Sequence, residues 1–105
     1  MATRCTIKIQ GINYAKVYKH WDGYPEATLQ WLKDFNAKFE NDRGFSDPQY
    51  KFAQLLRSSA WDSEQYNLDP SKATGWGVVD FTDFLWEEYE YTLTPDSVIV
   101  KKINS

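Results

Sequence analysis

The sequence predicts a single α+β domain, residues 1–105, in which an antiparallel sheet carries two helices packed on one face. Two observations lead to this fold class. Apolar and polar residues alternate with the period of strands at both ends of the chain. In the middle, apolar residues recur three and four positions apart, as they do on one side of a helix. The elements therefore follow the order ββααβββ, which favours helices segregated from an antiparallel sheet.

The first two strands are predicted over residues 4–10 and 14–20, on either side of a turn at 11–13. A three-residue turn brings the apolar side chains of both strands onto one face, whereas a two-residue turn would set Ile7 opposite Lys16. The predicted pairs are Ile9 with Ala15, Ile7 with Val17, and Cys5 with Lys19.

Two helices are predicted next. The first begins at Pro25, which suits the first helical turn, and runs to about Phe39. The second begins at Pro48, after a cap at Ser46-Asp47. Its predicted apolar face consists of Phe52, Ala53, Leu56 and Ala60. The polar stretch 61–74 is predicted to be a long surface loop.

Three further strands are predicted in the last third of the chain. Residues 75–81 form the third strand, and an unusually apolar connection follows at 82–86. Residues 87–93 and 98–103 form a closing hairpin around Pro95-Asp96. Its predicted pairs are Leu93 with Val98, Tyr91 with Val100, and Glu90 with Lys101. The acidic residues of this region are expected to form a solvated edge rather than a metal site: Glu87, Glu88 and Glu90.

The amino-acid composition argues against several classes of partner and cofactor. The chain has 12 basic and 15 acidic residues, and the net charge of -3 argues against a partner that is extended nucleic acid. One cysteine and one histidine can form neither an internal disulfide nor a Cys/His zinc cluster, so no metal and no cofactor are expected. No apolar run is long enough to span a membrane, and residues 1–4 lack a signal-peptide pattern, so we expect a cytoplasmic protein without a membrane partner.

The face of the first hairpin that points away from the core is predicted to be basic and aromatic. The register leaves four pairs on it: Arg4 beside His20, Thr6 beside Tyr18, Lys8 beside Lys16, and Gln10 beside Tyr14. We call this set the basic stripe. Two facing lysines repel each other by a few tenths of a kcal/mol, roughly. Either the lysines splay into solvent, or an anion or acidic partner lies across them.

Residues 18–26 are predicted to form a corner from a strand, through a turn, into a helix whose free N–H groups favour anions. The pair Asp22-Gly23 is typical of a turn. His20 is expected either to stabilise this turn by a hydrogen bond to Asp22 or to form part of a ligand site. We include Trp76 among the predicted ligand-binding residues because its flanking glycines let a ligand approach the backbone, although these glycines also fit a β-bulge. The residues predicted to bind a small anionic ligand are Arg4, Tyr18, His20, Trp21, Asp22, Tyr24 and Trp76.

Aromatic residues make up 17% of the chain, more than we expect so small a domain to bury completely. Phe84, Leu85 and Trp86 form an apolar run inside a connection, where exposed patches usually mark an interface. We predict that these three residues bind a protein partner or a second copy of the chain.

Catalytic signals are weak. His20 is the only histidine, and neither a phosphate loop nor a nucleophile elbow accompanies it. We favour a protein without enzymatic activity. The alternative is a hydrolase or nucleotide-modifying enzyme that uses His20 and Asp22.

Four motifs are spread over nearly the whole chain: Arg4 after a threonine, the run Tyr18-Lys19-His20-Trp21-Asp22-Gly23-Tyr24-Pro25-Glu26, Thr74-Gly75-Trp76-Gly77, and Glu88-Tyr89-Glu90-Tyr91. Together they resemble a family of small uncharacterised proteins of bacteriophages, prophages and bacterial or archaeal genomes. Its members share a start like "STRA" and a "Y-[KR]-H-x-D-G-Y-P-E" box. The chain departs from that pattern at Cys5, where the family tends to have alanine, and at 84–86, where a polar acidic loop is expected. The resemblance implies a fold and a phage-like setting rather than a reaction.

We therefore expect a small non-enzymatic binding protein, phage- or prophage-encoded and acting in the host cytoplasm. It would antagonise host defence by capturing a nucleotide-like anion or by docking on a host protein. Besides the enzyme, the remaining alternative is a self-associating structural protein, a homo-oligomer built on the surplus aromatics.

Overall fold

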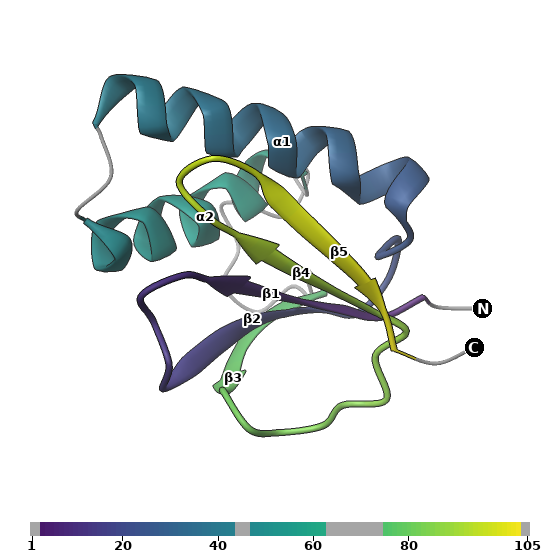
Figure 1. Cartoon of the computed structure of the whole chain (residues 1–105). Coiled ribbons are helices and arrows are strands. Elements are labelled where there is room, and N and C mark those ends of the chain that lie inside the picture. The colour runs from purple at the N-terminus through teal and green to yellow at the C-terminus, as the bar shows by residue number, and fades with distance from the viewer. Residues whose placement is uncertain (1–2, 44–46, 63–74, 104–105) are drawn as a thin grey trace.

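The computed structural model describes residues 3–43, 47–62 and 75–103. The elements within these ranges are β1 (Cys5–Ile9), β2 (Ala15–Lys19), α1 (Pro25–Asp42), α2 (Pro48–Asp62), β3 (Trp76–Asp80), β4 (Tyr89–Leu93) and β5 (Val98–Lys102) (Figure 1). Neither described helix combines the length and apolar composition that crossing a membrane requires. Residues 61–62 belong to α2, and the rest of the predicted 61–74 loop lies outside the described residues, as does the predicted cap residue Ser46.

The five strands form one mixed sheet in the order β3-β2-β1-β4-β5, and both helices lie on one face of it (Figure 1). β1 and β4 are parallel, whereas the other neighbouring strands are antiparallel. The α+β class is confirmed, but the prediction of a wholly antiparallel sheet is wrong. The reason is that the closing hairpin joins the free edge of β1 instead of extending the sheet from β3.

The registers of the two hairpins agree with the sequence prediction. The described pairs of the first hairpin include Cys5 with Lys19 and Ile7 with Val17. Those of the second include Leu93 with Val98, Tyr91 with Val100, and Glu90 with Lys101. Register is strongly specified where alternate residues are buried, because a slip of one position would turn every apolar side chain into solvent.

The connection from β3 to β4, residues 81–88, crosses the sheet on the face opposite the helices, and we call it the strap (Figure 1). It joins two strands that run in the same direction, a link that usually needs a dozen or more residues and a helix. Three contacts fix its course: the Phe81 ring lies 4.5 Å from Lys8 Nζ, the Asp83 carbonyl accepts a hydrogen bond from Lys16, and the Glu88 N–H donates to the Arg4 carbonyl at 2.9 Å.

The core lies between the sheet and the helices, with Leu32 of α1 and Leu55 of α2 fully buried against the strands. The predicted apolar face of α2 is partly wrong, because Ala53 is exposed while Leu55 is inside. Lys51 explains the difference. This lysine is only 3% exposed and forms an ion pair of 2.7 Å with Glu40 of α1, so the side of α2 that carries Lys51 and Leu55 faces inward.

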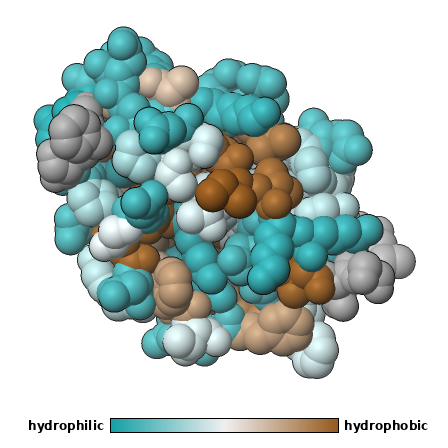
Figure 2. Space-filling model, viewed as in Figure 1, coloured by the Kyte–Doolittle hydropathy of each residue, from teal (hydrophilic) through white to brown (hydrophobic). Residues whose placement is uncertain are grey.

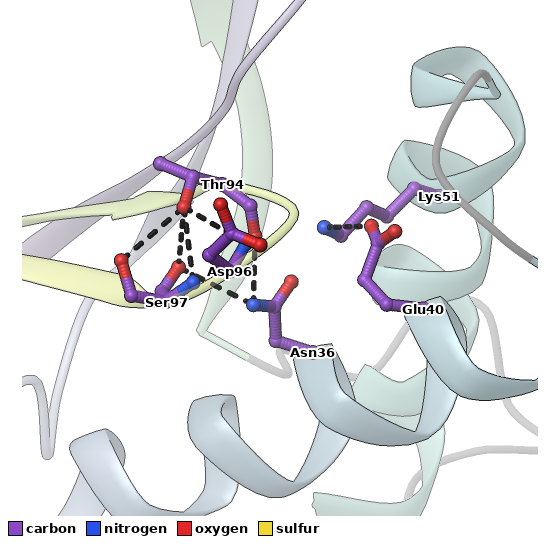
Figure 3. Close-up of polar contacts among 6 residues, drawn as sticks. All are labelled: Asn36, Glu40, Lys51, Thr94, Asp96 and Ser97. Atoms are coloured by element: carbon purple, nitrogen blue, oxygen red, sulfur yellow. Dashed lines mark hydrogen bonds and ion pairs between the residues drawn. The ribbon is translucent and has the colours of Figure 1, made fainter.

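The buried side chain of Asn36 ties the β4–β5 turn to α1 (Figure 3). Asn36 is 4% exposed, and its Nδ2 donates to the carbonyl oxygens of Thr94 at 2.8 Å and Ser97 at 3.3 Å. The Thr94 hydroxyl oxygen accepts a hydrogen bond from the Ser97 N–H at 3.0 Å, and this bond closes the turn. The closing hairpin is thereby fixed against the helical layer at its tip.

Candidate functional site

The corner between β2 and α1 is built around Gly23, which is buried. Its N–H donates to the Thr3 carbonyl at 2.9 Å, and its carbonyl accepts the Tyr91 hydroxyl at 2.6 Å. A Cβ at this position would lie 2.8 Å from Cys5 Cβ and 2.9 Å from the Thr3 carbonyl oxygen. Asp22 precedes it with φ 58°, a left-handed conformation that aspartate tolerates better than most residues. The Asp-Gly pair therefore fixes the corner.

Lys19 supports the corner from the core side of the sheet. Its side chain is 6% exposed, and Nζ donates to the carbonyl oxygens of Trp21 at 3.1 Å and Asp22 at 3.4 Å. Burial raises the pKa of the neighbouring Cys5 thiol to about 12, and the Lys19 charge opposes this shift. This lysine therefore holds the turn together.

The His20 side chain lies on the opposite face of the sheet, where it is hydrogen-bonded to Tyr18. The Tyr18 hydroxyl is 2.7 Å from His20 Nδ1, and the imidazole makes an edge-to-face contact with Trp21 at 5.3 Å between centroids. The expected bond between His20 and Asp22 is not formed. Alternation along β2 puts Tyr18 and His20 on the same face, whereas Asp22 follows the end of the strand and offers its carbonyl to Lys19 and, at 2.6 Å, to Thr28.

Trp21 and Tyr24 are the exposed aromatic residues of the corner, at 40% and 38%. The Trp21 ring covers Gly75, where φ is 81° and an added Cβ would lie 2.8 Å from Trp21 Cε2. The Gly75 carbonyl also accepts the His20 N–H at 2.7 Å. In this structure Gly75 therefore accommodates Trp21.

The start of α1 offers little to an anion. Pro25 has no N–H, and the N–H groups of Ala27 and Thr28 donate to the Tyr24 carbonyl at 3.0 and 3.1 Å. The carboxylate of Glu26 lies in the same turn and would repel an anion there. The first turn therefore lacks the array of free N–H groups on which helix-terminus anion sites depend.

The two lysines of the basic stripe form ion pairs with acidic residues of this chain. Lys8 pairs with Glu90 at 3.1 Å, and Lys16 pairs with Glu87 at 3.7 Å. Glu87 is 2% exposed and also accepts the Thr6 hydroxyl at 3.3 Å. The expectation of a solvated edge is therefore wrong for Glu87. The strap carries Glu87 back over the sheet, where it pairs with Lys16, while Glu90 of β4 pairs with Lys8.

The residues predicted to bind a ligand do not all share one surface. Tyr18 and His20 lie on the strap side of the sheet, and continuing the alternation of β1 by one residue puts Arg4, which precedes that strand, on the same side. Trp76 lies on the helix side, where its ring meets Trp31 of α1 at 5.5 Å between centroids. The sheet therefore separates Trp76 from Tyr18 and His20, which the sequence predicts to form one group.

Two aromatic side chains of the strap, those of Phe84 and Trp86, are exposed to solvent. Trp86 is 69% exposed and Phe84 is 52% exposed, and their rings make an edge-to-face contact at 5.1 Å between centroids. Leu85 is half-buried, and its N–H donates to Glu87 Oε1 at 2.7 Å. Trp86 has φ 62°, an uncommon conformation for a bulky residue. The side chains of Phe84 and Trp86 therefore project into solvent from a backbone segment that the neighbouring Glu87 anchors.

A groove of about 550 Å³ between α1 and α2 is a feature that the sequence does not predict. Three aromatic rings line it, from Phe35, Phe39 and Tyr50, and three cations stand around them: Lys38, Arg43 and Arg57. The spacing of Phe35 and Phe39 was the available signal. Residues four positions apart lie on the same side of a helix, but the orientation of these two toward α2 depends on how the two helices pack.

In the part of the chain that the structure describes, no three His, Cys, Asp or Glu side chains group closely enough to hold a metal ion. No protein-family model, curated protein or solved structure matches this chain.

Proposed function

We propose that this chain is a non-enzymatic binding protein that docks on another protein through Phe84 and Trp86 of the strap. The observation that carries the proposal is the exposure of this aromatic pair, 52% and 69%, on the face of the sheet opposite the helices. Tryptophan and other aromatic side chains contribute a large share of binding energy at protein interfaces.

The anchoring of the strap supports this proposal. Glu87, next to Trp86, is buried and holds Lys16 and Thr6 beneath the strap. The left-handed backbone at Trp86 is a local strain of the kind that clusters at functional sites. A side chain that is already fixed in position loses less conformational entropy when it binds. An anchored, exposed tryptophan therefore suits a docking role.

The geometry supports docking on a protein better than catalysis or anion capture at the corner. The imidazole of His20 contacts the Tyr18 hydroxyl rather than the Asp22 carboxylate that the enzyme alternative requires. The lysines of the stripe are paired with Glu90 and Glu87. The resemblance to phage and prophage proteins suggests a host protein, such as a component of host defence, as the partner.

Substitution of Trp86 by serine is expected to abolish docking without unfolding the protein, because the side chain is largely in solvent. The measurement is photo-cross-linking in host cytoplasm from a benzophenone side chain placed at position 84, with and without Trp86→Ser. We expect one discrete adduct that disappears in the Trp86→Ser protein. Tyr14→Ser is the matched control, since Tyr14 is 61% exposed but lies outside the strap.

Sedimentation of the purified protein separates a foreign partner from a second copy. Association that grows with protein concentration and is lost in Trp86→Ser would identify a homo-oligomer through the same surface. A monomer at every concentration, combined with an adduct that persists in Trp86→Ser or is equally sensitive to Tyr14→Ser, contradicts the docking proposal.

Arg4 supports a second candidate, anion binding beside His20. Within the described residues its guanidinium has no hydrogen bond or ion pair, unlike the lysines of the stripe. We expect Arg4→Ala to change the free energy of unfolding by no more than about 0.5 kcal/mol. It should also remove the NMR shift that inorganic phosphate induces at His20. A phosphate shift that survives Arg4→Ala, or a variant that unfolds, rules out this role for Arg4.

A further inference from the structure

The groove between α1 and α2 has a continuous aromatic floor. The Phe39 ring lies 6.3 Å from the Phe35 ring and 5.9 Å from the Tyr50 ring, measured between centroids. The row therefore crosses from one helix to the other. Tyr50 is 38% exposed, so a ligand in the groove can reach it. Successive rings of this kind provide a surface on which a planar molecule can stack.

Cations surround this floor in a protein whose net charge is -3. The Arg43 guanidinium lies 4.0 Å from the Tyr50 ring centroid, and Lys38 and Arg57 line the same groove together with one acidic residue, Asp42. Lys38 and Arg43 form exposed pairs with Asp42 and Asp47, at 3.0 and 2.9 Å. Exposed pairs of this type contribute roughly 0–1 kcal/mol, so they exchange readily for a ligand.

Arg57 differs from the other two cations. Within the described residues it has no acidic partner, and its only side-chain hydrogen bond is to the neutral Gln54 amide oxygen at 3.4 Å. Its charge is therefore available to a ligand that enters the groove. Guanidinium groups combine a planar face for stacking with a fork of N–H donors that matches carboxylate, sulfonate and phosphate oxygens.

We propose that this groove binds a planar aromatic anion, with its ring system packed on Tyr50 beside the small exposed part of Phe39 and its negative group bonded to Arg57 and Arg43. The volume of about 550 Å³ is in the range of small-molecule sites and accommodates a ligand of two or more fused rings. The site is independent of the strap and goes beyond the proposed docking function.

The test uses the whole chain and three small organic probes, each followed by NMR titration of the backbone amides. 2-Naphthoate is planar and charged, 2-naphthamide is planar and neutral, and cyclohexanecarboxylate is charged without an aromatic ring. We expect 2-naphthoate to bind most tightly and to shift amides of α1 and α2 that border the groove. Arg57→Gln should weaken its binding about tenfold, the effect of losing one charge-assisted hydrogen bond.

Lys33→Gln is the matched control, because Lys33 is an exposed cation of α1 that does not line the groove. It should leave the affinity for 2-naphthoate unchanged, and Tyr50→Leu should lower that affinity while sparing the weak binding of cyclohexanecarboxylate. The proposal is overturned if 2-naphthamide binds as tightly as 2-naphthoate, or if Arg57→Gln and Lys33→Gln have equal affinities. It is also overturned if the shifts centre on the strap or if no probe gives a saturable shift.

Discussion

Glu87→Ala is expected to lower the free energy of unfolding by about 3–5 kcal/mol, the usual cost of leaving one member of a buried ion pair without the other. Lys16 is 4% exposed and, among the described residues, would keep only the Asp83 carbonyl as a partner. The Thr6 hydroxyl, fully buried, would lose its acceptor as well. Urea denaturation followed by tryptophan fluorescence measures the loss.

Glu90→Ala is the control for this result. Glu90 also pairs with a lysine of the stripe, Lys8, but the two side chains are 19% and 21% exposed, and we expect a loss of about 1 kcal/mol. The double variant Lys16→Met with Glu87→Leu should recover most of the stability, because it removes both buried charges. If Glu87→Ala costs no more than Glu90→Ala, the buried pair is not what anchors the strap.

Gly23→Ala is expected to cost about 3 kcal/mol, toward the upper end of the range for overpacking. The added Cβ would lie 2.8 Å from Cys5 Cβ and 2.9 Å from the Cys5 nitrogen, and backbone atoms cannot move aside as a flexible side chain can. The shift would also strain the bond between the Gly23 carbonyl and the buried Tyr91 hydroxyl. Urea denaturation again gives the free energy.

Alkylation of Cys5 provides a second readout of the same change. The thiol is fully buried and its pKa is raised to about 12, so it should react only when the structure opens. A loss of about 3 kcal/mol would raise the alkylation rate about a hundredfold. Gly77→Ala is the control, because nothing lies within 4 Å of an added Cβ there. Equal rates for the two variants would show that Gly23 is not required for packing.

The sequence predicts the two hairpins well because each register buries one set of alternating apolar residues and no other register does. It does not predict where the hairpins meet. The pattern of β4, with Tyr91 and Leu93 buried, is satisfied beside β1 or beside β3, so local alternation cannot choose between a parallel and an antiparallel neighbour. The strand that lies next to β1 is decided by long-range packing.

The candidate site shows the same limit. Exposure of Phe84 and Trp86 follows from an apolar run in a connection, and the structure displays both side chains. The partners of Lys16 could not be predicted, since Glu87 belongs to a segment distant in the chain and was expected at a solvated edge. Tyr18 and His20 were placed on one face by alternation, but their direct contact depends on side-chain conformation.

The strap has little spare length, and this limits how its sequence can vary. Its end points at Asp80 and Tyr89 are separated by three strand spacings and about four residues along the strands, roughly 20 Å in the plane of the sheet. The nine steps between them span at most about 30 Å, and part of that is used in rising over Lys16 and Thr6. Deletion of one residue would therefore pull Glu87 off its partners, whereas an insertion near Phe84 would only lengthen the projecting part. Relatives of this chain should differ here by gained residues and rarely by lost ones.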